Sequence, residues 1–482
     1  MTTAAKKAAA RSERTTQAKA HEVNESAMLY GTFAEIGAGQ EVARHFFMAG
    51  KASQTIAKTI SAYDMIYSDE IYGKEASGRY VCESRLLKML TKEYDLLDKR
   101  LSKIRGDTTT FFAFADTVAT SDLAKRQSHG WMGVRFQTTP HGRPNDIIVH
   151  VRMLDRYRLL QQEALGTMGV NLVYAAAKQP MEVSELISTL VENIKDGQVV
   201  IDMVRATGPD MEHINNYLLN LELVRRGLAE AVLFSPEQDI ISVSDTLYGK
   251  PVIIERGSFH PVTNSHLDLM KRGAEYFKTA FPNAKEPLPL FEVTMNQLEV
   301  QGRFEEQDFL DRVRALASTG HHVLVSNFQL FFKLKNYLRQ YTKEPIAMIV
   351  GARLLEKLFN EDYYKDLDGG IMEGLGKFLG RFTRLFVYPF RSGDSCMTTK
   401  TYFPPKNVAN LYKHFLDLGW VVDMADCEEI SEFITSEKIH EMIRSGKKDW
   451  IKYVPEQVAH MIQEDLLFGV KPAPKTSAKT SS

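Results

Sequence analysis

The chain has 482 residues, which is too long for one ordinary hydrophobic core and predicts two or three domains. Its 60 Lys and Arg are balanced by 61 Asp and Glu, so no overall positive charge favours nucleic acid as a partner. No apolar run is long enough to span a membrane, and the N-terminus lacks the apolar segment of a secretory signal. We therefore expect no membrane association and a cytoplasmic location.

The three cysteines, Cys82, Cys396 and Cys427, are odd in number and far apart in the sequence. Their spacing matches neither a zinc site nor a disulfide framework, which favours a reducing compartment. No histidine or cysteine cluster has the spacing of metal ligands either. The sequence thus predicts no disulfide and no metal site built by the chain itself.

The first half of the chain predicts a tail followed by an α/β domain. Residues 1–22 are basic and alanine-rich, which predicts a disordered tail, although a transit peptide would have the same composition. Residues 23–245 are expected to form an N-terminal α/β domain of unknown role. Within it, apolar spacings of three and four predict helices through residues 22–105, including 33–50 and 84–104.

The later part of this domain mixes strands and helices. Residues 108–120 predict a strand, and 130–138 with 146–154 predict a hairpin. The alternation continues through four further segments, which are residues 169–177, a helix at 183–195, a strand at 198–206 and a helix at 213–228.

Two patterns in this half suggest ligand chemistry and are set aside. "IGAGQEVA" at residues 36–43 lacks the third glycine of a dinucleotide fingerprint and follows no convincing strand, so a helix cap or kink is expected. Asp116 ends an apolar strand as a phosphatase nucleophile would, but Val118 stands where the second aspartate is required.

Residues 250–466 predict a separate doubly wound α/β domain with a parallel sheet. Strands are expected at 251–255, 291–295, 321–327, 346–351 and 384–390, with helical patterns between them. A helical insert at 352–380 suits a lid or a partner surface, and the sequence does not choose between them. The polar end at 470–482 is expected to be a disordered tail.

The loop after the first of these strands is the strongest candidate for a binding site. Ligands of open α/β sheets bind beyond the carboxyl ends of the strands. Gly257 permits close backbone approach, and Pro261 stiffens the turn. Thr263, Asn264 and Ser265 all have residue types that favour helix N-caps. Phosphate oxygens placed there would meet free N–H groups and the positive end of the helix dipole. His266 would lie in the first helical turn.

The segment "GSFHPVTNSHLDLM" resembles the signature of the adenylyltransferases in the nucleotidyltransferase superfamily. Six positions match in order: Gly257, Ser258, Phe259, Pro261, Thr263 and His266. Residues 434–462 resemble the second motif of this family, through Ile434, Thr435, Ser436, Ile439 and the pair Val454–Pro455. The motif differs at Glu437, where the family has a small hydroxyl residue, and at His440, where it has a phosphate-binding arginine.

A third segment, residues 346–359, is similar to the strand of this family that ends in Gly-any-Asp. Gly351 matches, whereas Arg353 occupies the position of the acid. The resemblance covers residues 250–465, close to half of the chain. It implies a Rossmann-like nucleotidyltransferase domain.

The resemblance implies that the enzyme joins ATP to nicotinate or nicotinamide mononucleotide and releases pyrophosphate, with Mg²⁺ bridging the triphosphate. His266 and Thr263 would contact the α- and β-phosphates, and the amides of Ser258 and Phe259 would hold phosphate oxygens. Ser436 would cap the last helix toward the β- and γ-phosphates. The remaining expected nucleotide-site residues are Gly257, His260, Gly351, His440 and Arg444, with Arg444 as a replacement for the missing arginine.

Two alternatives stay open at this stage. The same loop resembles that of phosphopantetheine adenylyltransferase, whose domain is more compact. The departures at Arg353, Glu437 and His440 also suit a catalytically inactive domain that binds nucleotide in a regulatory or scaffold protein. Homo-oligomer formation is compatible with either.

Overall fold

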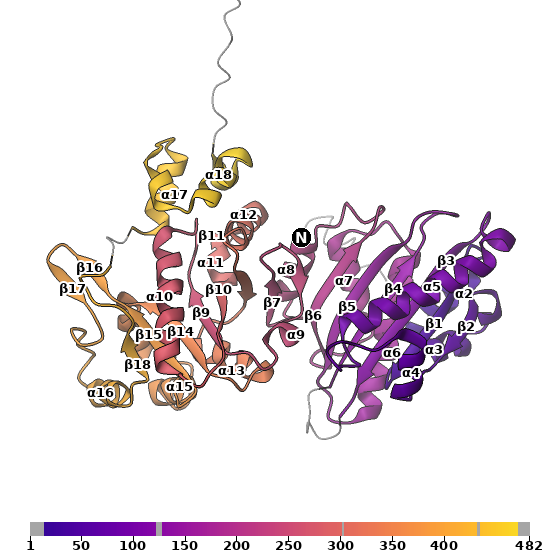
Figure 1. Cartoon of the computed structure of the whole chain (residues 1–482). Helices are drawn as coiled ribbons and strands as arrows, with labels where there is room; N and C mark the ends of the chain where they lie inside the picture. Colours follow the sequence, from indigo (N-terminus) through magenta and orange to yellow (C-terminus); the bar gives the residue numbers. More distant parts are fainter. Residues whose placement is uncertain (1–13, 122–127, 301–302, 431–433, 471–482) are drawn as a thin grey trace, which may run out of the picture. The chain divides into compact units, whose positions relative to one another are not determined.

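The computed structural model describes residues 14–121, 128–300, 303–430 and 434–470 (Figure 1). The chain divides into two compact units, residues 1–230 and 231–482. The boundary lies ahead of the position expected from the sequence, because strands β7 and β8, which were expected in the first domain, pair with the sheet of the second unit. The predicted tail at 470–482 lies outside the described residues, apart from Val470.

The first unit is built on a mixed six-stranded sheet with the order β2-β1-β3-β4-β5-β6. Strand β1 runs parallel to β2 and β3, and the remaining neighbours are antiparallel. The strands are β1 (Leu29–Gly37), β2 (Ile56–Ile60), β3 (Thr110–Ala119), β4 (Ser128–Phe136), β5 (Asn145–Met153) and β6 (Val199–Thr207). The predicted hairpin and the strands at 108–120 and 198–206 are confirmed.

Helices cover both faces of this sheet. The helices are α2 (Thr16–Glu25), α3 (Val42–Ala49), α4 (Met65–Tyr72), α5 (Glu83–Arg105), α6 (Arg158–Ala177), α7 (Val183–Val191) and α8 (Asn216–Arg225). Leu86 and Leu90 of α5 pack over Gly133 on one face, whereas Val42 of α3 and Gly169 of α6 meet Phe114 on the other. The unit therefore has a core on each side of the sheet.

Two predicted elements of the first unit were wrong. Residues 33–37 belong to strand β1 rather than to a helix, because Phe33 and Ala34 pair with the buried centre of β3. Residues 169–177 continue the 20-residue helix α6 instead of forming an element of their own. This helix is buried around most of its circumference, so it lacks the amphipathic spacing that identifies a surface helix.

The predicted disordered tail at 1–22 was also wrong where the structure describes it. Thr15 caps helix α2, and Ala20 and Val23 are buried against the unit. The Lys19 ammonium is fully buried and donates to Asn171 Oδ1 at 2.7 Å. Helix α2 has few apolar residues, so no amphipathic pattern identifies it in the sequence. Its buried polar groups find hydrogen-bond partners only in the folded chain.

The second unit contains an eight-stranded sheet with the order β18-β15-β14-β9-β10-β13-β7-β8. All neighbours from β18 to β13 are parallel, as predicted, and β7 and β8 add an antiparallel edge. The strands are β7 (Ala231–Phe234), β8 (Ile240–Ile241), β9 (Val252–Arg256), β10 (Leu288–Thr294), β13 (His322–Ser326), β14 (Ile346–Gly351), β15 (Thr383–Tyr388) and β18 (Val421–Asp423). Two small hairpins accompany them, β11 (Glu299–Val300) with β12 (Arg303–Phe304), and β16 (Phe390–Ser392) with β17 (Ser395–Met397).

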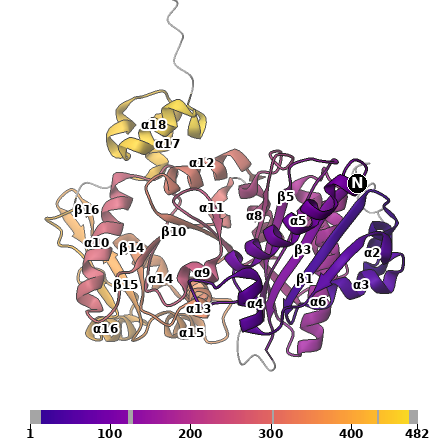
Figure 2. The ribbon, with the colours of Figure 1, turned by 45° about the vertical axis from the view of Figure 1, so that its right-hand side comes forward.

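Helices lie on both faces of this sheet too (Figure 1). They are α9 (Val243–Leu247), α10 (Asn264–Ala280), α11 (Met295–Leu298), α12 (Glu306–Ala317), α13 (Phe331–Tyr341), α14 (Leu355–Leu358), α15 (Gly370–Phe378), α16 (Ala409–Asp417), α17 (Ser436–Arg444) and α18 (Glu456–Glu464). Short 3₁₀ helices add η3 (Ala352–Leu354), η4 (Glu361–Tyr364), η5 (Asp449–Tyr453) and η6 (Leu467–Gly469). Helices α17 and α18 lie together near α12 in both views (Figures 1 and 2).

The strand order reverses beside β9, and we use 'crevice' for the position between β9 and β14 outside their carboxyl ends. From β9 the chain adds β10 and β13 on one side, then returns to add β14, β15 and β18 on the other. Open α/β sheets bind ligands at such a reversal, outside the carboxyl ends of the strands. The loops that follow the parallel neighbours β9 and β14 leave the same edge of the sheet at this point.

The insert at 352–380 packs into the core of the second unit. Ile371, Leu375 and Phe378 of α15 join the same buried cluster as Met348 of β14. A Cβ on Gly374 would lie 2.2 Å from the Tyr364 ring, so the packing there is close. Of the two uses the sequence suggested, a mobile lid does not fit this burial.

Cys396 and Cys427 form a disulfide, so the prediction that the cysteines are unpaired was wrong for these two. They are 31 residues apart in sequence, but the chain folds back through β18 and brings their Cα atoms to 6.2 Å. Cys82 is free and buried. Within the described residues, none of the helices combines the length and hydrophobicity needed to cross a bilayer.

Candidate functional site

The loop at residues 257–263 connects β9 to α10 at the crevice. Phe259 has a φ of +45°, an uncommon backbone conformation for a residue with a side chain. Its ring is fully buried between His266 and Phe291, with ring centroids 4.9 and 5.0 Å away. A Cβ on Gly257 would lie 2.8 Å from this ring, which explains why glycine is needed there. The loop therefore packs against the core through the Phe259 side chain.

Thr263 and His266 form a capping box at the start of α10. The Thr263 hydroxyl accepts from the His266 N–H at 3.4 Å, and His266 Nδ1 accepts from the Thr263 N–H at 3.0 Å. A Nδ1 that accepts from a backbone N–H carries no proton, so the proton of the neutral ring is on Nε2. This arrangement confirms the predicted N-cap and leaves Nε2–H as a hydrogen-bond donor.

Burial keeps His266 neutral. Its side chain is 8 % exposed, and burial lowers its pKa to about 4, against a smaller opposite effect of the Glu437 carboxylate. At neutral pH the ring can donate a hydrogen bond to an anion, but it brings no positive charge. A second source of positive charge is therefore needed if this loop holds phosphates.

His260 points away from the phosphate position that the sequence assigned to it. Its Nε2 lies 2.7 Å from Asp308 Oδ1, and Arg312 donates to its Nδ1 at 3.2 Å. Arginine has donors only, so Nδ1 accepts and Nε2–H is directed at the carboxylate. Both ring nitrogens are thus used within the protein, and His260 as a phosphate ligand is corrected to a structural role.

Asp308 and Arg312, on α12, are site residues that the sequence did not reveal. They are four residues apart, so they share one helix face, and their side chains form an ion pair at 2.6 Å. Arg312 is 2 % exposed and donates to the Ser258 carbonyl at 3.0 Å. An acid–base pair at this spacing could be read from the sequence, but nothing there connects it to a loop some 50 residues earlier.

The N-terminus of α17 meets the same loop. Ser436 is buried and donates to the Pro261 carbonyl at 3.1 Å. Thr435, rather than Ser436, is the N-cap, since its side chain accepts from the Lys438 N–H. The predicted cap is therefore displaced by one residue, and Ser436 instead attaches α17 to the loop.

Glu437 places a negative charge at this loop. Its Oε1 lies 3.4 Å from Ser258 Oγ, which donates to it. A carboxylate in the first turn of α17 suits the helix dipole, but it opposes an anion bound beside Ser258. The departure that the sequence showed at this position thus has a direct electrostatic effect on the candidate site.

His440, the other position at which the second motif differs, does not supply a positive charge. The His440 ring lies 3.7 Å from the His260 ring between centroids, and both contact Phe468. Burial and the neighbouring His260 lower the pKa of His440 to about 4, so it is neutral at pH 7. Arg444 is exposed in the last turn of α17, and among the described residues it makes no hydrogen bond or ion pair to the loop.

The end of β14 completes the crevice. Gly351 is exposed, and a Cβ built there meets nothing within 4 Å, so the space beside it is open. Arg353 is exposed with its guanidinium 5.1 Å from the Phe390 ring centroid. The structure thus brings Gly351 to the reversal point of the sheet and places a cation where the family has an acid.

A strand–loop–helix unit of the same kind is found in the first unit, where the sequence predicted a helix cap or kink. Strand β1 ends at Gly37, and residues 38–41 lead into α3. This prediction was wrong because β1 does precede the glycines. The chain adds β2 on one side of β1 and later β3 on the other, so this loop also lies at a reversal of strand order.

Two buried carboxyl groups occupy the position below this loop. Glu35 and Asp116 are directly paired across β1 and β3. Glu35 accepts from the N–H groups of Val42 and Ala43, at 2.8 and 3.2 Å, and so occupies the N-terminus of α3. A Cβ on Gly39 would lie 2.3 Å from Asp116 Oδ1, so the loop covers this carboxyl group.

Burial dominates the electrostatics of the pair. It raises the pKa of Glu35 to about 7, although the two backbone N–H groups oppose the shift. Burial and the nearby Glu35 also raise the pKa of Asp116 well above its ordinary value. This loop therefore covers two buried carboxyl groups, and Glu35 already accepts from two N–H groups at the start of α3.

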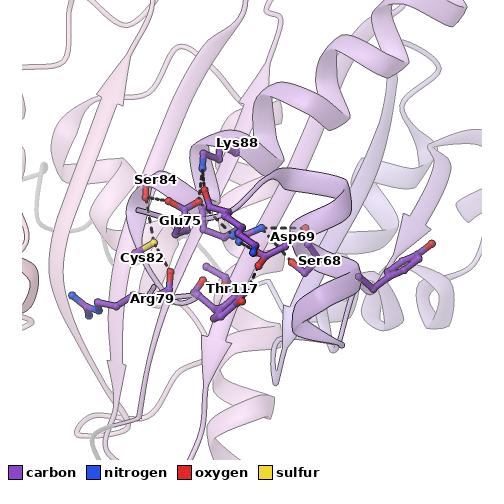
Figure 3. A network of polar contacts seen from close by, with 12 residues as sticks. Ser68, Asp69, Glu75, Arg79, Cys82, Ser84, Lys88 and Thr117 are labelled. Carbon is purple, nitrogen blue, oxygen red and sulfur yellow. Dashed lines mark hydrogen bonds and ion pairs between the residues drawn. The ribbon is translucent and has the colours of Figure 1, made fainter. Parts of the chain in front are cut away.

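A network of ion pairs and hydrogen bonds joins side chains around α4 and α5 in the first unit (Figure 3). The buried Arg85 lies 2.6 Å from Asp69 and 3.5 Å from Glu75, and it donates to the Ser68 carbonyl. Ser84 donates to Glu75 at 2.6 Å. The pairs tie the segment before α5 to α4, which indicates a structural role for this network.

Groups that could cage a metal ion are absent from the described residues: no three His, Cys, Asp or Glu side chains converge. Two carboxylates contact the candidate loop, Glu437 through Ser258 and Asp308 through His260, and Asp308 is paired with Arg312. Such a site fits a cation carried by the phosphates of a ligand, since Mg²⁺ commonly keeps several waters and takes few protein ligands.

Comparison with known proteins gives limited matches. No protein-family model matches the chain, and no curated protein sequence matches it. Solved structures with a partial likeness include the competence/damage inducible protein CihA from Agrobacterium tumefaciens, at 16% identity over 34% of this chain and 96% of that chain, with a TM-score of 0.25. A CinA superfamily protein from Klebsiella pneumoniae matches at 15% identity over 34% of this chain and 96% of its own, with a TM-score of 0.24. Likeness of this extent carries no information on activity.

Proposed function

We propose that the second unit transfers the adenylyl group of ATP to nicotinate or nicotinamide mononucleotide, forming a dinucleotide and releasing pyrophosphate. The observation that carries this proposal is the Thr263–His266 capping box in the loop at the strand reversal. It directs a neutral Nε2–H donor at the start of α10, beside a crevice that Gly351 leaves open. The sequence resemblance supplies the substrate class.

The reaction requires positioning more than acid–base chemistry. A phosphate monoester has a second pKa near 6, so its oxygen is already a nucleophile at pH 7. That oxygen attacks the α-phosphorus of ATP, a new P–O bond forms, and the bond from the α-phosphorus to the bridging oxygen of the β-phosphate breaks. Pyrophosphate leaves with the bonding electrons, so no protein base is needed.

His266 suits the role of a donor to phosphate oxygens in this reaction. Thr263 fixes its tautomer, and the fixed ring needs no reorganisation as negative charge shifts toward the leaving group. The Ser258 amide and the start of α10 would add backbone donors. Mg²⁺ would accompany the triphosphate, neutralise part of its charge, and find in Glu437 the nearest carboxylate of the loop.

A second candidate function is nucleotide binding without turnover, in a regulatory or scaffold protein. It is favoured by His440, which is neutral and stacked on His260 where the family has an arginine. An adenylyltransferase for phosphopantetheine remains a third candidate, with the same chemistry on a different acceptor. We also propose a cytoplasmic location, because each of these candidate functions uses ATP. The Cys396–Cys427 pair would be held reduced there.

The test is pyrophosphate release from Mg-ATP by the full chain, with nicotinate mononucleotide, nicotinamide mononucleotide and phosphopantetheine offered separately. His266→Glu is the informative variant, because Glu at this position preserves a capping box but replaces the donor with an anion. We expect release with one of the two nicotinate-type acceptors and a loss of about 100-fold or more in the variant. His414→Ala, at an exposed position of α16, is the matched control and should keep full activity.

The outcomes separate the candidates. Pyrophosphate release with phosphopantetheine alone would show that it, rather than a nicotinate-type mononucleotide, is the acceptor. Binding of Mg-ATP without pyrophosphate release in any arm would favour the nucleotide-binding scaffold. Full activity of a folded His266→Glu chain would contradict the assigned role of the loop.

A further inference from the structure

A buried guanidinium lies directly behind the candidate phosphate loop, on a helix that neither sequence motif includes. Arg312 projects from α12 and is 2 % exposed. Its NH1 donates to the Ser258 carbonyl at 3.0 Å, and its NH2 contacts Asp308 at 2.6 Å and His260 at 3.2 Å. One side chain thereby joins the loop to α12 and, through the stacked His260 and His440 rings, to α17.

The contact with Ser258 determines which edge of a peptide the loop presents. The Ser258–Phe259 bond is trans, since the cis bonds of the described chain lie elsewhere. In a planar trans peptide the carbonyl and the N–H point in opposite directions. Arg312 holds the Ser258 carbonyl toward α12, so the amide edge faces the other way.

The strand order shows what lies on that other side. Helix α12 packs beside β13, on the β10 flank of β9, whereas the crevice lies on the β14 flank. The amide edge of the peptide is therefore directed toward the crevice. A flipped peptide would instead turn the lone pairs of the carbonyl toward bound phosphates and repel them.

Arg312 also supplies positive charge at the loop itself, whereas Arg353 lies at the end of β14 over the Phe390 ring. His266 and His440 are neutral at pH 7, His260 is used within the protein, and Glu437 is negative. Asp308 balances Arg312 in part, but it also accepts a hydrogen bond from His260, and the guanidinium is the cation nearest the loop among the groups that contact it.

We propose that Arg312 is the positioning residue of the phosphate loop: it holds the Ser258–Phe259 peptide with its amide edge toward the crevice and replaces the positive charge missing at position 440. This inference rests on the proposed function of the same site. It differs from the sequence expectation, which assigned that replacement to Arg444.

The experiment measures Mg-ATP binding by calorimetry and the KM values of ATP and acceptor for the full chain. Arg312→Met should weaken Mg-ATP binding by about 10- to 100-fold, while the KM of the acceptor stays unchanged. Arg312→Lys should recover part of the loss, since an ammonium keeps the charge but cannot replace the planar fork that reaches Ser258 and Asp308 together. Arg314→Met, on the same helix with an exposed ion pair to Asp465, is the control and should bind normally.

Removal of Arg312 alone leaves Asp308 buried without its partner, which could unfold the unit. A double variant, Asp308→Asn with Arg312→Gln, removes both charges while keeping polar side chains, and its melting temperature is compared with that of the wild type. A folded double variant that binds Mg-ATP as the wild type does would overturn the proposal, as would equal losses for ATP and acceptor.

Binding and turnover distinguish the two proposals. A wild-type chain that binds Mg-ATP but releases no pyrophosphate contradicts the proposed reaction, and the Arg312 effect can still be measured in binding. A wild type that turns over and an Arg312→Met chain that is unaffected contradict only the positioning role. Absence of Mg-ATP binding in the wild type overturns both.

Discussion

The two units of this chain place a glycine-containing loop at the same topological position, and the loops differ in charge. In each unit a central strand ends where the strand order reverses, and the following loop leads into a helix. In the first unit the loop covers Glu35 and Asp116, and Glu35 already occupies the helix N-terminus. In the second unit the loop is backed by Arg312 and presents the Nε2–H donor of His266.

The comparison shows that backbone geometry alone does not make a phosphate site. A strand reversal and a helix N-terminus supply a possible ligand position and partial positive charge, but one buried carboxyl group is enough to occupy N–H groups of the helix terminus. The side chains below the loop therefore decide which of the two positions can hold a nucleotide.

The largest effect that separates the units is expected from the disulfide. Only the second unit contains the Cys396–Cys427 crosslink, and its removal by Cys396→Ser or by reduction should destabilise that unit by roughly 2–4 kcal/mol. Peroxide oxidation of buried methionines along a urea gradient reports each unit separately, with Met203 in the first and Met348 in the second. An equal shift at both methionines would show that the units do not unfold separately.

The next largest difference is expected in how the stability of each unit depends on pH. Burial raises the pKa of Glu35 to about 7, so the stability that its neutral form provides is present below about pH 4.5 and is lost as pH rises through 7. Burial lowers the pKa of His266 from 6.5 to about 4, so the second unit loses stability as pH falls from 6.5 to 4. Each change is roughly 3 kcal/mol.

The same methionine oxidation measured from pH 4 to 8 checks these two slopes. Glu35→Gln should reduce the slope of the first unit, and His266→Gln should reduce that of the second, where His440, whose pKa is also lowered to about 4, keeps part of the slope. Slopes of the same sign in both wild-type units would contradict the assigned protonation states.

A smaller effect is expected at Glu437, the carboxylate that contacts Ser258 of the nucleotide loop. Glu437→Ser removes its repulsion of phosphate and should lower the KM of ATP a few-fold, as for a charge pair partly exposed to solvent. Glu441→Ser, an exposed acid one turn later on α17, is the control. An increase in KM for Glu437→Ser would indicate that the carboxylate assists the Mg²⁺ of the bound nucleotide instead.

The sequence predicted the second unit better than the first for a physical reason. Buried parallel strands form continuous apolar runs, and the crossover helices between them are amphipathic, so both signals are strong for β9 to β15. Strand β1 contains Glu35 and two glycines, which weaken any strand pattern, and α6 is buried nearly all round. Helix α2 is polar, and its stability depends on contacts such as Lys19 with Asn171, 152 residues away.

For the site, the sequence predicted the local features and missed the long-range ones. The cap at Thr263 and the position of His266 follow from residue types within four positions. Three other features depend on α12 and α17, which are far away in sequence. Both ring nitrogens of His260 have partners, the His260 ring lies against that of His440, and Arg312 contacts Ser258. The disulfide was missed for the same reason.

The most direct test of the central claim, that charge below the loop selects the second unit for nucleotide, is calorimetric titration of the full chain with Mg-ATP. The wild type, His266→Glu and Glu35→Gln are compared, so that each loop is altered once at a buried position. The account predicts one binding site in the wild type, its loss in His266→Glu and unchanged binding in Glu35→Gln. Loss of binding in Glu35→Gln with full binding in His266→Glu would contradict it.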